Sequence, residues 1–214
     1  MNILSFVGKS DSGKTSVLEK IIAELKKRGY KIAVIKHTQD FELDREGTSS
    51  WRLGQAGSDA IILSSPGQIA SIQKTEHDLS PKELLPFVNG NFDLILTEGF
   101  KTAANKKVEL HRKEQGEGLL CPPEQLLAVV TDERLNVDVP QFSHDDAKSL
   151  ADLIETWMRK TEPENEVQLF INKETISLNP FVKGMFMQTL MGMVSSLKGV
   201  KDIKELRLFI RRKS

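Results

Sequence analysis

A glycine-rich segment near the amino terminus has the residue types and spacing of a phosphate-binding loop. Residues 8–15, GKSDSGKT, match G-x-x-x-x-G-K-[ST] at every fixed position. The two glycines let main-chain N–H groups close around a phosphate, the lysine can reach the terminal phosphates, and the threonine hydroxyl can bind Mg²⁺. The predicted nucleotide-binding residues of this segment are Gly8, Lys9, Ser10, Asp11, Ser12, Gly13, Lys14, Thr15 and Ser16.

The flanking sequence supports this interpretation over a simple glycine turn. Residues 3–7 form an apolar run that predicts a buried strand. Apolar residues then recur at helical spacing from Val17 to Leu25, which predicts an amphipathic helix. A helix that begins near Gly13 adds unpaired amide donors and the positive end of its dipole to the loop.

An acidic residue at the end of a second apolar strand is expected to complete a magnesium site with Thr15. Glu98 follows residues 92–97, which predict an interior strand beside the first. Ligands of parallel α/β sheets bind at the carboxyl ends of strands, so Glu98 is favoured over Asp93, which opens the same strand. We therefore predict Thr15 and Glu98 as metal ligands.

Four further residues are candidates for the same site. Lys36 and His37 follow the predicted strand 30–35, where they contact phosphate or lie at a solvated strand end. Asp132 follows the predicted strand 126–130, and its carboxylate can accept two N–H groups from guanine, although the fuller N-K-x-D signature is absent. Arg52 either stabilises transition-state charge or forms an ordinary surface ion pair. With Lys14 and Glu98, it completes the predicted catalytic set.

The composition restricts the class of protein. The chain of 214 residues contains 30 Lys and Arg and 30 Asp and Glu, so no net positive charge attracts nucleic acid. No apolar run approaches the ~20 residues that span a bilayer, and the first strand begins without a leader sequence. The single cysteine, Cys121, suits a reducing compartment. We expect a cytoplasmic protein that binds neither nucleic acid nor membrane.

Alternating strand and helix patterns predict an α/β fold with a mainly parallel sheet, in the three-layer arrangement of P-loop NTPases. A short helix is expected after Ser49 or Ser50 as N-cap, with Trp51, Leu53 and Ala56 on its buried side. The predicted organisation is a nucleotide-binding domain at 1–160, a linker at 161–166 and a small ββαβ (α+β) unit at 167–214. In that unit, residues 167–171 and 175–178 predict a hairpin, 181–197 a helix and 205–211 a final strand.

Taken together, the motifs resemble the MobB family of molybdopterin-guanine dinucleotide biosynthesis adaptor proteins over residues 1–158. The resemblance rests on GKSDSGKT, VIKHTQDFELDREGTSSWRLGQAG, TEGFK, VELHR and VVTDE. The sequence departs from the family at Thr48 and Ser49, where lysine and aspartate are usual.

The resemblance implies a homodimeric GTP-binding protein with weak hydrolysis, which uses GTP and Mg²⁺. Its partner would be the guanylyltransferase that joins GMP to molybdopterin, with molybdopterin itself or a molybdoenzyme as further candidates. A small-molecule kinase is the main alternative, since it shares the strand, loop and metal site; only Asp44 and Arg52 offer it a catalytic carboxylate and lid arginine. A metal-insertion GTPase would need a His/Cys cluster, and four scattered histidines and one cysteine give poor spacing.

Overall fold

The computed structural model describes residues 2–41, 44–116, 118–161, 167, 169–172, 174–201, 203, 206, 208 and 210. Its centre is a six-stranded sheet of order β2-β5-β1-β6-β7-β8, in which neighbouring strands are parallel. The strands are β1 (Asn2–Gly8), β2 (Ile32–Lys36), β5 (Leu94–Glu98), β6 (Lys106–His111), β7 (Leu126–Thr131) and β8 (Gln141–Phe142). The predicted α/β class is confirmed, whereas the two-residue β8 was not predicted.

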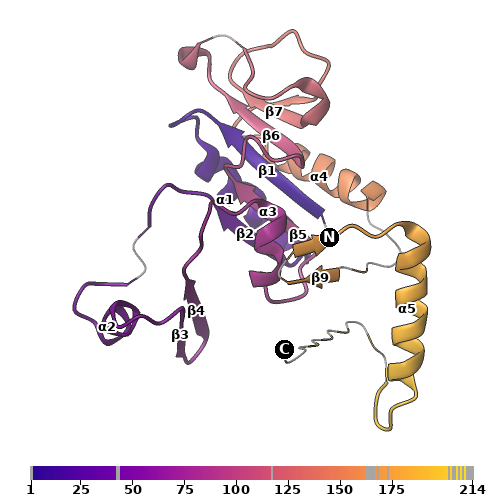
Figure 1. Ribbon diagram of the computed structural model, residues 1–214. Coiled ribbons are helices and arrows are strands. Elements are labelled where there is room, and N and C mark those ends of the chain that lie inside the picture. The colour runs from indigo at the N-terminus through magenta and orange to yellow at the C-terminus, as the bar shows by residue number, and fades with distance from the viewer. Residues whose placement is uncertain are drawn as a thin grey trace.

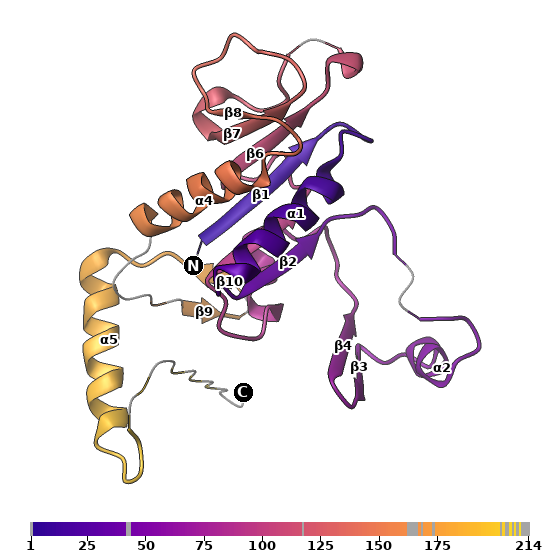
Figure 2. The ribbon, with the colours of Figure 1, turned by 180° about the vertical axis from the view of Figure 1, so that it is seen from behind.

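Two helices cover one face of the sheet. Figures 1 and 2 show α1 (Lys14–Lys27) and α4 (Ala147–Thr161) side by side on this face. Leu4 and Phe6 of β1 are fully buried against the apolar stripe of α1, because alternate residues of a strand point to the same face. The apolar residues buried on α1 are Val17, Leu18, Ile21 and Leu25.

The other face has a thinner cover. Figure 1 shows α3 (Pro81–Leu84) in front of β2 and β5, and the 3-10 turn η1 (Leu85–Phe87) follows it. Ser80 caps α3 in a capping box with Glu83. Over β6 and β7, a smaller apolar cluster includes Val7 and Cys121. Two further 3-10 turns, η2 (Lys113–Gln115) and η3 (Pro123–Gln125), lie between these two strands in the chain.

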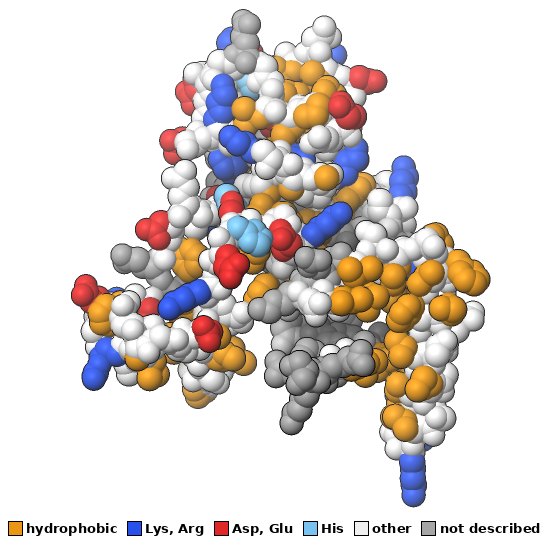
Figure 3. Space-filling model, viewed as in Figure 1, with side chains coloured by type: hydrophobic (Ala, Val, Ile, Leu, Met, Phe, Trp, Pro, Cys, Tyr) orange, Lys and Arg blue, Asp and Glu red, His pale blue; other side chains and the backbone are white. Residues whose placement is uncertain are grey.

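A separate arm, residues 44–74, projects from the sheet (Figures 1 and 2). It consists of α2 (Ser49–Gln55) and an antiparallel hairpin of β3 (Ala60–Ser65) and β4 (Gln68–Gln73). The prediction for this helix was wrong in two respects. Thr48 is the N-cap, and α2 has no buried residue, because it packs beside the hairpin rather than on the sheet. Figure 3 shows hydrophobic side chains at the surface of the arm.

The carboxyl-terminal part contains the predicted hairpin, β9 (Leu169–Ile171) with β10 (Glu174–Ile176), and the predicted helix as α5 (Pro180–Ser195). The expected linker falls mostly on residues 162–166, which lie outside the described residues. Within the expected strand 205–211, only Leu206, Leu208 and Ile210 are described, and none of them is in a strand. In the described part of the chain, no helix is long and apolar enough to cross a membrane.

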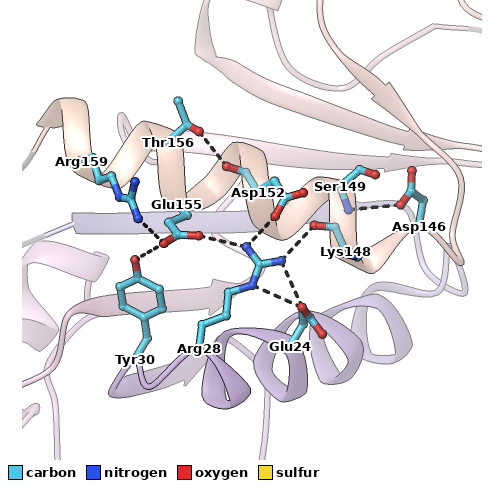
Figure 4. Close-up of polar contacts among 10 residues, drawn as sticks. All are labelled: Glu24, Arg28, Tyr30, Asp146, Lys148, Ser149, Asp152, Glu155, Thr156 and Arg159. Carbon is cyan, nitrogen blue, oxygen red and sulfur yellow. Dashed lines mark hydrogen bonds and ion pairs between the residues drawn. The ribbon is translucent and has the colours of Figure 1, made fainter.

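An ion-pair network joins the end of α1 to α4 (Figure 4). Nη1 of Arg28 lies 2.7 Å from Asp152 and 3.0 Å from Glu155, and Nη2 lies 3.1 Å from Glu24. The Tyr30 hydroxyl donates to Glu155 at 2.8 Å. Three carboxylates therefore share one guanidinium, whose side chain is 19% exposed. The pKa of Glu155 is lowered by the hydrogen bonds from Tyr30 and Arg28.

Replacement of this guanidinium is expected to destabilise the packing of α1 on α4. Arg28→Met leaves three carboxylates near one another without their shared cation, which should lower the free energy of unfolding by about 1–3 kcal/mol in urea titrations. Arg159→Ala is the matched control, because its 73% exposed side chain pairs with the same Glu155 and should cost less than about 1 kcal/mol. Equal losses in both variants would contradict the assigned role of Arg28.

Candidate nucleotide-binding site

The glycine-rich loop lies between β1 and α1, and two of its glycines are needed for its geometry. A Cβ on Gly8 would lie 2.6 Å from the Leu110 carbonyl oxygen and 2.6 Å from Ser12 Oγ, so only glycine fits there. Gly13 is the N-cap of α1 with φ 87°, a left-handed conformation that glycine adopts without strain. Asp11 also has positive φ, at 60°. The loop therefore has the tight backbone path that a phosphate cradle requires.

Lys14 and Thr15 begin α1 and point their polar atoms to different partners. The Lys14 ammonium donates to the carbonyl oxygens of Lys9 at 2.6 Å and Gly8 at 3.2 Å. Desolvation lowers the pKa of Lys14, and the nearby Glu98 and Asp11 oppose that shift. The Thr15 hydroxyl donates to Glu98, with Oγ1 at 3.1 and 3.2 Å from the two carboxylate oxygens.

Glu98 stands beside the loop because of the strand register. It is opposite Phe6 of β1 and Lys36 of β2, and its side chain is 13% exposed. Lys36 Nζ lies 3.4 Å from Glu98 Oε1. Asp93 instead precedes β5 at the opposite end and accepts from the Lys31 amide at 2.7 Å. A hydroxyl and a carboxylate are hard oxygen donors that suit Mg²⁺, so Thr15 and Glu98 fit this ion.

His37 lies next to Glu98, and its side chain has partners outside the loop. Its amide donates to the Glu98 carbonyl at 3.0 Å, while Nε2 lies 2.8 Å from Asp78 Oδ2. Its ring is 4.7 Å from that of Phe100, centroid to centroid. The imidazole is therefore held between Asp78 and Phe100, two residues that the sequence analysis did not select.

The structure does not bring Arg52 to the loop. Arg52 is on α2, and Figures 1 and 2 show that α2 stands apart from β1 and α1. Asp44 also has its hydrogen-bond partners within the arm, because it accepts from the hydroxyls of Thr48 at 2.7 Å and Ser50 at 2.8 Å. The side chains of Asp44, Thr48 and Ser50 thus organise the start of α2.

Asp132 follows β7 and is held from two sides. Its Oδ1 accepts from the Lys113 amide at 2.9 Å, and its Oδ2 lies 3.4 Å from Arg112 Nη1. These contacts, led by the amide of Lys113, lower the pKa of Asp132. A hollow of about 530 Å³ is lined by residues that include Thr131, Asp132 and Ser143. It lies at the carboxyl end of β7, where the sequence analysis placed the base.

Two residues contact the loop that the sequence analysis did not select. The side-chain amide of Gln115 donates to the Ser10 carbonyl at 2.7 Å, and the main-chain carbonyl of Gln115 accepts from Lys9 Nζ at 2.5 Å. His144 Nε2 lies 3.3 Å from the Ser12 carbonyl. Gln115 ends the short 3-10 turn η2 and His144 lies in a turn before α4, where neither periodicity nor a motif marks a residue for this role. Ser16, the third residue of α1, is exposed.

The surroundings of Cys121 indicate a structural role for this residue rather than a chemical one. It is buried, and burial with the neighbouring Glu109 raises the pKa of its thiol to about 11. The thiol is therefore neutral at physiological pH and a poor nucleophile or ligand. Among the described residues, no group of three or more His, Cys, Asp or Glu side chains could hold a metal ion.

A glycine-rich loop between a buried parallel strand and a helix, with a Thr–Glu pair beside it, defines an α/β protein of the P-loop NTPase type. The chain matches the family described as "MobB: Molybdopterin guanine dinucleotide synthesis protein B" over residues 3–132. It belongs to this family.

The relatives cover the core and, in one case, nearly the whole chain. The molybdopterin-guanine dinucleotide biosynthesis adapter protein of Haemophilus influenzae is 37% identical over 158 residues, 73% of this chain and 89% of its own. A relative from Methanocaldococcus jannaschii is 25% identical over 235 residues, 98% of this chain and 97% of its own. The crystal structure of Bacillus subtilis MobB has a TM-score of 0.59 and 26% identity, covering 73% of this chain and 97% of that one.

Proposed function

We propose that this protein is a GTP-binding adapter in the synthesis of molybdopterin-guanine dinucleotide. In this role it binds Mg²⁺-GTP and assists the guanylyltransferase that attaches GMP to molybdopterin. Membership of the MobB family and the adapter activity named for its Haemophilus influenzae relative support the pathway. Molybdopterin or a molybdoenzyme is a further candidate partner.

One observation carries the nucleotide part of the proposal: Thr15 Oγ1 lies 3.1 Å from the Glu98 carboxylate, at the mouth of the glycine-rich loop. In proteins of this fold, a hydroxyl at the start of the helix and a carboxylate at the end of a neighbouring strand hold the Mg²⁺ of a nucleotide triphosphate. The ion would neutralise part of the phosphate charge. Lys14, one residue before Thr15, supplies the ammonium.

The position of Arg52 supports slow intrinsic hydrolysis. An arginine that stabilises transition-state charge must reach the terminal phosphate, and α2 stands apart from the loop. The same separation counts against a small-molecule kinase, because Asp44 and Arg52 were its two candidate residues. An adapter that signals by bound nucleotide needs little catalysis.

Loss of the Lys14 ammonium should weaken nucleotide binding. We expect Lys14→Ala to raise the Kd for Mg²⁺-GTP about 10- to 100-fold, measured by calorimetry, because a charge-assisted contact to phosphate is removed. Lys26→Ala, on the exposed surface of the same helix, is the charge-matched control and should bind as the wild type does.

The adapter role is tested in a reconstituted reaction. Purified guanylyltransferase, molybdopterin and GTP are assayed for dinucleotide formation with and without this protein. We expect the wild type to stimulate formation and Lys14→Ala to stimulate it less at subsaturating GTP. Unchanged affinity in Lys14→Ala would refute the site, and phosphate transfer to a small acceptor would favour the kinase.

Glu98→Gln isolates the contribution of Mg²⁺. The amide keeps the size and a hydrogen-bond acceptor for Thr15 but removes the anionic ligand. We expect GTP affinity in the presence of EDTA to change little, while the gain in affinity on adding Mg²⁺ falls about tenfold. Asp93→Asn, at the other end of β5, is the matched control. A normal Mg²⁺ response in Glu98→Gln would exclude this carboxylate as a ligand.

The arm supports the homodimer. Ile62 and Ile69, on one face of the β3–β4 hairpin, are 69% and 75% exposed, whereas Ile61, which points to the other face, lies next to Gly54 of α2. A second copy of the chain would cover this face. We expect Ile62→Glu/Ile69→Glu to shift the protein to monomer in sedimentation equilibrium. Gln68→Glu, which adds charge to β4 next to Ile69, should not. A dimer unaffected by the double substitution would place the interface elsewhere.

A cytoplasmic location fits the same role. The single cysteine is buried and neutral, so the fold needs no disulfide and tolerates a reducing compartment.

A further inference from the structure

Arg112 lies against the phosphate loop from the side opposite Glu98. The strand order places β1 between β5 and β6, so Glu98 approaches the loop from β5, and Arg112, the residue after β6, approaches it from the other side. A Cβ on Gly13 would lie 3.4 Å from Arg112 Nη2. The guanidinium therefore lies beside the residue that caps α1, where the main-chain donors of the loop end.

Asp132 holds this guanidinium in place. Oδ2 of Asp132 lies 3.4 Å from Nη1 of Arg112, while its Oδ1 accepts from the Lys113 amide. Among the described residues, Arg112 has no other ion pair. Nη1 is thus directed to Asp132 and Nη2 to the loop. Both carboxylate oxygens of Asp132 thus already have partners in this chain, with which a guanine base would have to share them.

The surroundings fix the loop relative to Arg112. Gln115, three residues further along, donates to Ser10 and accepts from Lys9, which ties the segment after β6 to the tip of the loop. His144 meets the Ser12 carbonyl, and its Cδ2 would lie 3.6 Å from a Cβ on Gly13. Asp132, the partner of Arg112, and Ser143, the residue before His144, both line the hollow beside β7. Arg112 therefore stands between the phosphate loop and that hollow.

We propose that Arg112 contacts the phosphate chain of the bound nucleotide on its nucleoside side, and that Asp132 is the positioning residue for Arg112 rather than the reader of the base. The inference rests on the proposed nucleotide function. A guanidinium held by a carboxylate at one edge presents its other N–H groups as a fixed fork, which suits phosphate oxygens. Lys14 and Mg²⁺ would then neutralise the terminal phosphates, and Arg112 would neutralise the phosphate charge on the nucleoside side.

Binding constants of variants test both parts. Kd values for Mg²⁺-GTP, GDP and XTP are measured for the wild type, Arg112→Ala, Arg112→Lys, Asp132→Asn and the double variant Arg112→Ala/Asp132→Asn. Lys113→Ala is the matched control, because it removes an adjacent exposed cation and keeps the backbone amide that binds Asp132. Thermal unfolding of each variant verifies that it is folded.

We expect Arg112→Ala to weaken GTP and GDP alike by about 10-fold or more, with Arg112→Lys intermediate because it keeps charge without the fork. Asp132→Asn should weaken GTP and XTP by the same factor. It should add little in the Arg112→Ala background, since a positioning residue acts through the residue that it positions. Lys113→Ala should bind as the wild type does.

Three outcomes would overturn the inference. A loss confined to GTP would move the contact of Arg112 to the γ-phosphate. Improved XTP binding by Asp132→Asn would mean that Asp132 reads the base, because the xanthine carbonyl accepts from an asparagine amide. Wild-type affinity in Arg112→Ala, with weakened binding in Lys14→Ala, would refute this inference and leave the proposed function intact, whereas a wild type that binds no nucleotide would refute both.

Discussion

The register of three parallel strands is the constraint on which the site depends. Phe6 of β1, Glu98 of β5 and Lys36 of β2 lie at one level across the sheet. A slip of one residue would turn every side chain of a strand to the other face, so the buried residues of β1 and β5 lock this level. The loop leaves β1 two residues after Phe6, and Glu98 is therefore beside Thr15 as a consequence of core packing.

A second set of buried polar contacts holds the segment that carries Arg112. Lys107 and Glu109 point from β6 into the protein and are almost fully buried. Glu109 accepts from the amides of Leu120 and Cys121, at 2.5 and 2.9 Å, and Lys107 donates to Gln125 Oε1 at 2.7 Å. Each buried charge is thus hydrogen-bonded to polar groups of the β6–β7 connection that would otherwise lack partners. These contacts hold the end of the β6–β7 connection that is nearer to β7. The hydrogen bonds of Gln115 hold the other end against the phosphate loop.

The core and the centre of the site could be predicted because each rests on a local signal. Apolar runs with helical or strand period mark β1, α1 and β5, and strand ends mark Glu98, Lys36 and Asp132. His144 and Gln115 carry no such signal, since they lie in short turns and reach the loop only through the tertiary fold. The burial expected for α2 was wrong because Leu53 and Ala56 have apolar spacing, but the helix packs on a hairpin rather than on a sheet. Periodicity states which face is apolar and not what covers it.

The cations of the site are all engaged before any ligand binds. Lys14 donates to two loop carbonyls, Lys36 faces Glu98, and Arg112 faces Asp132. In the proposed function, a bound triphosphate would replace the two loop carbonyls as the partner of Lys14, whereas Asp132 would keep Nη1 of Arg112. An exchange of this kind returns only the difference between two good interactions. In compensation, the loop and its cations are already placed, so little conformational entropy is lost on binding. The affinity should therefore depend on the ammonium of Lys14 and also on how well the pairs on each side of the loop, Lys36–Glu98 and Arg112–Asp132, hold their cations in place.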